Sequence, residues 1–203
     1  TVAGELTTPL ALPIDLALPA LPAFTAGGPP VVLTHHQHLA LQPGSYGKVE
    51  VKAGSANKPT VLALTGGVYE LVSIDVGSHA RVECLARCEL RVVGEVEVGS
   101  HGYLGPAKGS GLGDGQVVVL VGGASCPKPE VEVGPHARVV ARVFVAGGPI
   151  TLKNEVHAVG TFVASEMTVG PHATVQKGDR GLVSLRRNVL ATSPAPLGAL
   201  AAQ

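Results

Sequence analysis

The stretch Val76-Gly-Ser-His79-Ala-Arg-Val82-Glu-Cys84 contains the unit that decides the fold. Val-Gly-(Ser/Pro)-His recurs at 98–101, 133–136 and 169–172, and three of the four copies continue as Ala-x-Val. A unit that recurs within one chain indicates one piece of local structure used repeatedly. The start-to-start spacings are 22, 35 and 36 residues. We interpret them as one coil of a solenoid followed by two steps of about two coils each.

Strict alternation of apolar and charged residues surrounds these units. It is clearest at 48–52, 95–98 and 130–133, where valine alternates with lysine or glutamate. Alternation with β-branched residues is typical of a half-buried strand, and the glycines that end almost every run are typical of turns. A second motif, Leu-Ala-Leu-x-x-Gly-x-Tyr-x-x-Val, occupies 39–49 and returns at 62–72, a step of 23 residues.

Short strands with glycine corners are compatible with a sandwich, a barrel or a β-helix. Repeats of about 20 residues favour coils that stack on one another. The chain has no Trp, three Phe and three Tyr, whereas sandwich cores more often centre on large aromatic residues. We therefore predict an all-β, single-domain parallel β-helix (β-solenoid) with extended terminal arms, and keep a β-sandwich as the alternative.

Composition excludes several classes of protein. At 203 residues with 45% apolar content, the chain is long enough for one sizeable domain and too apolar for wholesale disorder. Fifteen basic residues balance fifteen acidic ones, so we expect no nucleic-acid partner. No stretch approaches the roughly 20 uncharged apolar residues of a spanning helix, so we expect no membrane span.

The two ends of the chain differ from its middle. We divide the sequence into an extended Pro/Ala/Leu-rich arm (1–30), a β-solenoid domain (31–187) and an Ala/Pro-rich tail (188–203). Proline every few residues blocks both helix and central strand in the arm. Its apolar residues fall at every second position: Leu10, Leu12, Ile14, Leu16 and Leu18. The arm packs either on its own solenoid or on a neighbour, and we expect it to serve in assembly.

Three cysteines leave the compartment ambiguous. Cys84 and Cys88 lie between two alternating strands, and a corner at 85–87 would bring them together. In a straight strand they would be about 13 Å apart, too far for a disulfide, so the bridge requires that corner. We predict this bridge, with two buried thiols as the alternative. Cys126 is then either free or bonded between chains. The chain begins at Thr1, which we interpret as the result of trimming an export signal or of cloning a fragment.

Histidine is the main candidate for chemistry. The repeat corners carry His79, His101, His136 and His172, and stacked corners would place imidazoles on adjacent coils about 4.8 Å apart, close enough to share a metal. We favour solvated turn residues instead, because no carboxylate has the spacing of a metal-hydrolase motif. The histidines at 35, 36 and 38 are explained equally well as polar residues in contact with solvent. We therefore expect no metal and no cofactor.

The usual catalytic motifs are absent from the sequence. The glycine-rich segment 105–115 lacks the Gly-Lys-(Ser/Thr) ending of a phosphate loop, so an inserted loop explains it better. There is no Gly-x-Ser-x-Gly elbow and no pair of carboxylates placed as acid and base. We expect no catalytic residues and no enzyme activity.

Segments 39–54, 62–76 and 164–175 resemble the coils of secreted bacterial β-solenoid proteins of uncharacterised function. More distantly, they are similar to bactofilins, which are polymer-forming β-helices with Val-Gly corners. The resemblance covers about 31–187, and its motifs are of low specificity. Bactofilin coils are shorter and more regular, and they normally lack these cysteines, the histidine corners and the long apolar arm. The resemblance implies a scaffold or filament.

We therefore expect a structural protein that assembles with itself into an extracellular filament or surface layer, secreted or at the cell surface. Other cell-surface components are further candidate partners. A cell-surface carbohydrate- or ligand-binding module is the alternative, and a lyase-type enzyme is third.

Overall fold

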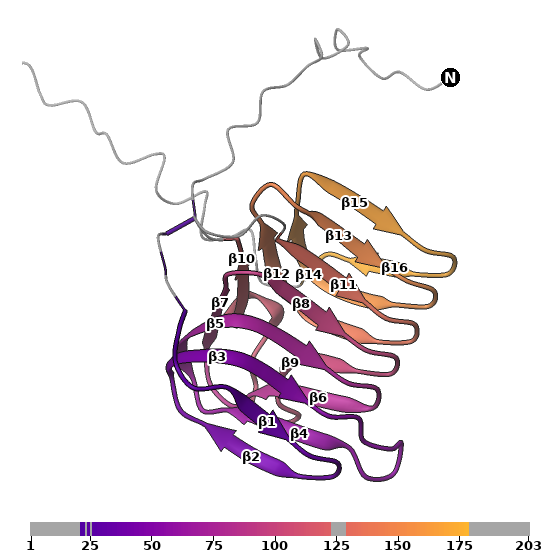
Figure 1. Cartoon of the computed structure of the whole chain (residues 1–203). Coiled ribbons are helices and arrows are strands. Elements are labelled where there is room, and N and C mark those ends of the chain that lie inside the picture. The colour runs from indigo at the N-terminus through magenta and orange to yellow at the C-terminus, as the bar shows by residue number, and fades with distance from the viewer. Residues whose placement is uncertain (1–20, 23, 25, 123–128, 179–203) are drawn as a thin grey trace, which may run out of the picture.

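The computed structural model describes residues 21, 22, 24, 26–122 and 129–178. Within them the chain winds into a parallel β-solenoid of about six turns, and all sixteen strands join into one continuous sheet (Figure 1). Every strand pair is parallel, which excludes the antiparallel sandwich that was the alternative from sequence. The only helical element in these ranges is one 3₁₀ turn, η1 (Asp114–Gln116).

Each coil contributes a strand to three faces, which we call the first, second and third. The first face contains β1 (Val31–Leu33), the second halves of β3 (Gly44–Val51) and β5 (Gly67–Val76), β8 (Glu95–Val98), β11 (Glu130–Val133), β13 (Pro149–Leu152) and β15 (Glu166–Val169). The second contains β2 (His38–Leu41), β4 (Thr60–Leu64), β6 (Ala80–Cys84), β9 (Tyr103–Pro106), the first halves of β12 (Arg138–Val145) and β14 (His157–Val163), and β16 (Thr174–Gln176). The third contains the first halves of β3 and β5, β7 (Cys88–Val92), β10 (Val117–Val121) and the second halves of β12 and β14.

The register corrects one interpretation of the repeat spacing. Val98 pairs directly with Val133, so these residues lie one coil apart and not two. The additional length comes from chain inserted around the third-face strand β10, including η1 between β9 and β10. The next step does contain two coils, because Val133 pairs with Leu152 and Leu152 with Val169. Insertions at corners therefore lengthen the repeat without disturbing the stack.

The core is a set of stacked aliphatic columns. Alternation places every second side chain inside, where aliphatic residues from successive coils contact one another. The repeat valines at positions 76, 82, 98, 133 and 139 are buried. Val169 and Val175 occupy the same columns but are exposed, because they lie on the last described coil.

The described part of the predicted arm nearest the solenoid packs on its own first coil. The Gly47 N–H donates to the carbonyl oxygen of Pro29 (3.0 Å), and Phe24 is buried. Residues 1–20, which include Leu10, Leu12, Ile14, Leu16 and Leu18, lie outside the described residues, as does the predicted tail 188–203.

Candidate functional site

The repeat corner between the first and second faces is a left-handed turn. His36, His79, His101, His136 and His172 all have φ between 54° and 63°, as does Glu155 in the intervening coil. Few residues other than glycine adopt this conformation, and asparagine, aspartate and histidine are the enriched exceptions. The repeated histidine is therefore explained first by the backbone of the corner.

Backbone hydrogen bonds connect these corners along the solenoid axis. The N–H of His79 donates to the Ser100 carbonyl oxygen, and that of His101 to the Pro135 carbonyl oxygen, both at 3.0 Å. The pattern continues where His136 donates to the carbonyl oxygen of Asn154, also at 3.0 Å. The corners thus extend the ladder beyond the strands and fix the side chains in one column.

The imidazoles of this column lie one above another as tilted rings, with interplanar angles of 33° and 39°. The ring centroids of His79 and His101 are 4.6 Å apart, and those of His101 and His136 are 4.7 Å apart. His136 Nδ1 lies 3.1 Å from a carboxylate oxygen of Glu155. In the described ranges, no three histidine, cysteine or acidic side chains are grouped as a metal site would require.

A column of carboxylates on the first face was missed by the sequence analysis. Glu50, Asp75, Glu97 and Glu132 are register partners in four consecutive coils, about 4.8 Å apart from one coil to the next. The sequence shows the alternating charges, but their alignment depends on the length of each coil, which only the strand register provides. Three of the four have lysine partners: Lys52 binds Glu50, Lys48 lies 3.7 Å from Asp75, and Lys153 binds Glu132.

Glu97 is the member of this column for which the described residues provide no salt bridge. Partial burial raises the pKa of its carboxyl above the usual value, and the adjacent carboxylates of Asp75 and Glu132 raise it further. In contrast, a hydrogen bond from Lys52 lowers the pKa of Glu50. The same column therefore contains one carboxyl group whose charged form is stabilised, that of Glu50, and one whose charged form is destabilised, that of Glu97.

The second face carries basic, aromatic and polar side chains in its outward column. Arg81 donates to Glu83 (2.6 Å) and lies over the ring of Tyr103, 4.6 Å from its centroid. Arg138 follows Tyr103 in register, then His157 and Thr174. No ion pair involving Arg138 is formed within the described residues.

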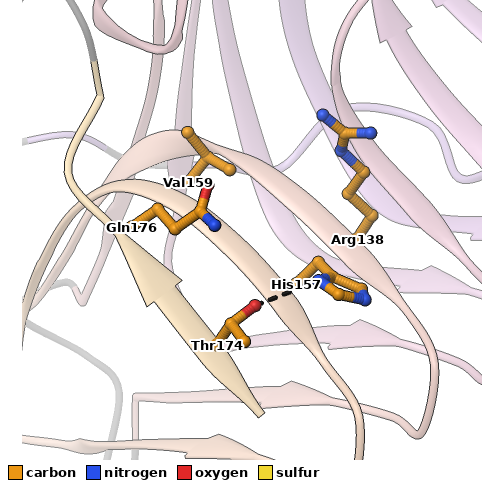
Figure 2. Close-up of a pocket in the computed structure, with 5 residues that line it drawn as sticks. All are labelled: Arg138, His157, Val159, Thr174 and Gln176. Atoms are coloured by element: carbon orange, nitrogen blue, oxygen red, sulfur yellow. Dashed lines mark hydrogen bonds between the residues drawn. The ribbon is translucent and has the colours of Figure 1, made fainter.

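A shallow depression of about 230 Å³ lies at the carboxyl-terminal end of this column. It is lined by Arg138, His157, Val159, Thr174 and Gln176, which belong to three consecutive coils (Figure 2). His157 Nδ1 and Thr174 Oγ1 are 3.0 Å apart, a hydrogen bond that fixes the imidazole ring. Sequence reasoning did not identify these residues, because register alone brings them together across insertions and corners.

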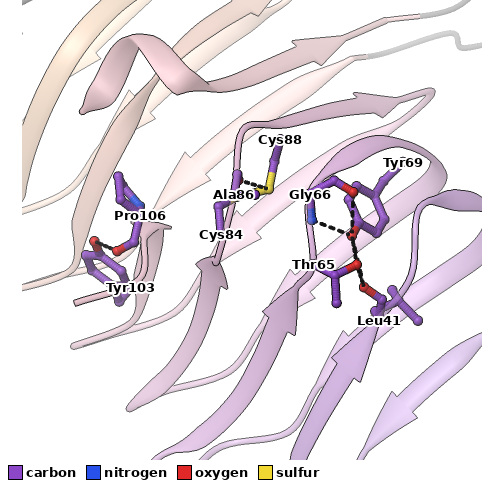
Figure 3. The surroundings of a disulfide bond; sticks show 9 residues. All are labelled: Leu41, Thr65, Gly66, Tyr69, Cys84, Ala86, Cys88, Tyr103 and Pro106. Carbon is purple, nitrogen blue, oxygen red and sulfur yellow. Dashed lines mark hydrogen bonds between the residues drawn. A yellow bond between two sulfur atoms is a disulfide. The ribbon is translucent and has the colours of Figure 1, made fainter. Parts of the chain in front are cut away.

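The structure joins Cys84 and Cys88 in a disulfide at the corner between β6 and β7 (Figure 3). Their Cα atoms are 6.1 Å apart, within the range for a bridge, because residues 85–87 turn the chain as the sequence analysis required. Both half-cystines are buried in the core. Cys126 lies outside the described residues.

Tyr69 is buried beside this region, and its hydroxyl forms a polar centre at the edge of the core (Figure 3). The hydroxyl donates to the Leu41 carbonyl oxygen (2.9 Å) and accepts from the N–H of Gly66 (3.3 Å). These bonds satisfy a polar group that would be costly to bury alone.

The two ends of the described solenoid differ in how they are covered. At the carboxyl-terminal end, the inward residues Met167, Val169 and Val175 are 39%, 50% and 46% exposed. At the amino-terminal end, Leu33 and Leu41 are buried, although Leu39 is exposed. Within the described ranges β1, β2, β15 and β16 each pair with one neighbour only, so each leaves one edge free.

Comparison of the chain with protein-family models, curated proteins and solved structures finds no significant match. The described part of the chain contains no helix with the length and hydrophobicity of a membrane span.

Proposed function

We propose that this protein is a structural, self-assembling protein whose solenoid subunits stack head to tail into an extracellular filament or surface layer. The observation that carries the proposal is the open carboxyl-terminal end, where Met167, Val169 and Val175 are exposed beside the free edges of β15 and β16. A free strand edge is a template for pairing with another chain. Exposed apolar side chains add a driving force for burial.

The occupant proposed for this end is a second copy of the chain. The free edges of β1 and β2 belong to the same two faces as β15 and β16. Stacking in the same direction would therefore continue the first and second faces, with Leu39 meeting the exposed residues of the last coil. The outward residues of β15 and β16 are Glu166, Thr168, Thr174 and Gln176, of which only Glu166 is charged.

The proposed extracellular setting is supported by the Cys84–Cys88 disulfide, since such bonds persist mainly in oxidising environments. The proposed role of residues 1–20 of the arm is to lie along the adjacent subunit and stabilise the contact between the two subunits. Its prolines reduce its freedom before docking, which lowers the entropic cost of ordering it.

Negative-stain electron microscopy and light scattering of the purified protein test the proposal. We expect elongated polymers for the natural sequence and monomers for Val169→Lys, which places a charge on the open end. The matched control is Val72→Lys, which alters an exposed valine on the side of the stack. If Val72→Lys abolishes the polymers and Val169→Lys does not, the subunits associate through their sides and not through their ends. Monomers or closed dimers of the natural sequence would contradict a filament.

Deletion of residues 1–20 tests the arm separately and leaves Phe24 in place. We expect a folded solenoid that forms shorter or fewer polymers. If the polymers are unchanged after the deletion, residues 1–20 have no role in assembly.

A further inference from the structure

The depression at Arg138 has the chemistry of an anion-binding site. Its polar lining consists of a guanidinium, an imidazole, a hydroxyl and an amide, and it includes no carboxylate. Arg138 forms no ion pair within the described residues, whereas Arg81 in the same column is neutralised by Glu83. A guanidinium that lines a depression, with no carboxylate partner among the described residues, presents a planar fork of donors that fits an oxyanion in two places.

The remaining polar groups are positioned to add to that fork. The contact between Thr174 and His157 Nδ1 leaves the Nε2 atom of the ring available to a ligand. The three side chains Arg138, His157 and Thr174 follow one another in register, so each is about one strand spacing from the next. Gln176 follows two residues after Thr174 on the same strand and lies beside its register partner Val159 (Figure 2).

The charge of the lining favours a monoanion. Phosphate dianions are commonly held by backbone N–H groups at helix N-termini or in nests. Here the lining side chains come from strands that belong to the continuous ladder, and Arg138 is the only permanently charged group in the lining. The single positive charge of this guanidinium matches the single negative charge of one carboxylate.

The size and the other groups favour a sugar as the carrier of that carboxylate. A volume of about 230 Å³ lies below the usual range for drug-sized ligands, and accommodates one small unit. Thr174 and Gln176 can each donate to and accept from sugar hydroxyls. Val159 provides apolar contact for ring carbons. Because the four polar residues are exposed, a longer chain can continue past the site.

We propose that the depression formed by Arg138, His157, Val159, Thr174 and Gln176 binds the uronic acid units of an acidic polysaccharide. The carboxylate pairs with Arg138, and the ring hydroxyls contact Thr174 and Gln176. The site lies on the outer surface of the second face, and its residues Thr174 and Gln176 belong to β16, the last strand before the open end. Val169, the residue chosen to test assembly, is on the first face and does not line the site.

Ligand-observed NMR titration with D-glucuronic acid tests the proposal, and it is usable whether or not the protein polymerises. We expect saturable binding of glucuronic acid, at least tenfold weaker binding of glucose, acetate and phosphate, and tighter binding of a glucuronate oligosaccharide. Arg138→Gln should weaken glucuronate binding at least tenfold. The control Arg81→Gln, which alters the same column outside the depression, should leave it unchanged.

Several outcomes would overturn the site. These are the absence of saturable glucuronate binding, equal binding of glucose, tighter binding of phosphate, and unchanged binding by Arg138→Gln. Circular dichroism of each variant verifies that the fold is retained. The Val169→Lys variant should bind glucuronate as the natural sequence does, so a failure of assembly and a failure of binding are distinguishable.

Discussion

Val133 and Val169 occupy the same inward column two coils apart, yet Val133 is 1% exposed and Val169 is 50% exposed. The same corner sequence, Gly-Pro-His-Ala, follows both residues. The difference therefore does not come from local sequence: a further coil covers Val133, whereas Val169 lies on the last described coil.

This pair provides a matched test of the core. We expect Val133→Asp to cost several kcal/mol and to abolish soluble folded protein, because it would place an unpaired charge among stacked aliphatic residues. Val169→Asp should cost less than about 1 kcal/mol, since water can reach its carboxylate. Soluble yield and thermal unfolding followed by circular dichroism measure both. An unchanged melting temperature for Val133→Asp would show that the coil alignment is wrong.

The corner disulfide is tested by counting thiols. Under denaturing, non-reducing conditions we expect one free thiol, from Cys126, because Cys84 and Cys88 are bridged. Replacing both bridged cysteines by serine should lower the free energy of unfolding by about 2 kcal/mol, a modest loss because the loop they close is short. Three free thiols would remove the bridge and the main support for an oxidising compartment.

The left-handed corner predicts which substitutions of His101 are tolerated. His101→Asn should have little effect, because asparagine adopts positive φ readily. His101→Val should be about 1–2 kcal/mol less stable than His101→Asn, since a β-branched side chain collides with the backbone in this conformation. Urea unfolding compares the two variants. Equal stabilities would mean that the histidines are retained for their side chains and not for the turn.

Glu97 predicts a pH-dependent stability effect. Because its pKa is raised in the folded protein, the folded state binds the proton more tightly, and stability decreases as the pH rises through that pKa. We expect Glu97→Gln to raise the melting temperature at pH 7, with a gain of less than about 1 kcal/mol that decreases in high salt. At about pH 3, where carboxyl groups are protonated, the gain should disappear.

The control for Glu97 lies in the same column. Because Lys52 lowers the pKa of Glu50, Glu50→Gln should slightly destabilise the protein at pH 7, the opposite sign. Thermal unfolding at both pH values measures both variants. If both substitutions shift the melting temperature in the same direction, the carboxylate column does not control the effect.

The sequence was sufficient to predict the coil but not the alignment of coils. The glycine and histidine of Val76-Gly-Ser-His79 specify a turn through local backbone preferences, and alternation around them specifies strands. These preferences can be recognised in a single sequence because each depends only on residues that are close together along the chain. Which residues then lie above one another depends on the length of every corner between them.

The candidate sites show this difference most clearly. Pairing of Val98 with Val133 could not be inferred, since inserted chain makes one coil as long as two. The carboxylate column around Glu97 and the depression at Arg138 both depend on such pairings. The Cys84–Cys88 bridge was predictable because only one three-residue corner separates its members.

The phenol of Tyr69 has a practical consequence for observing this molecule. The chain contains no tryptophan and only three tyrosines, so ultraviolet fluorescence and near-ultraviolet dichroism are not obscured by indole. Tyr69 is fully buried and hydrogen-bonded, whereas Tyr46 and Tyr103 are only partly covered. A Tyr46→Phe, Tyr103→Phe background would therefore leave one intrinsic optical probe inside the second coil, able to report its opening without an added label.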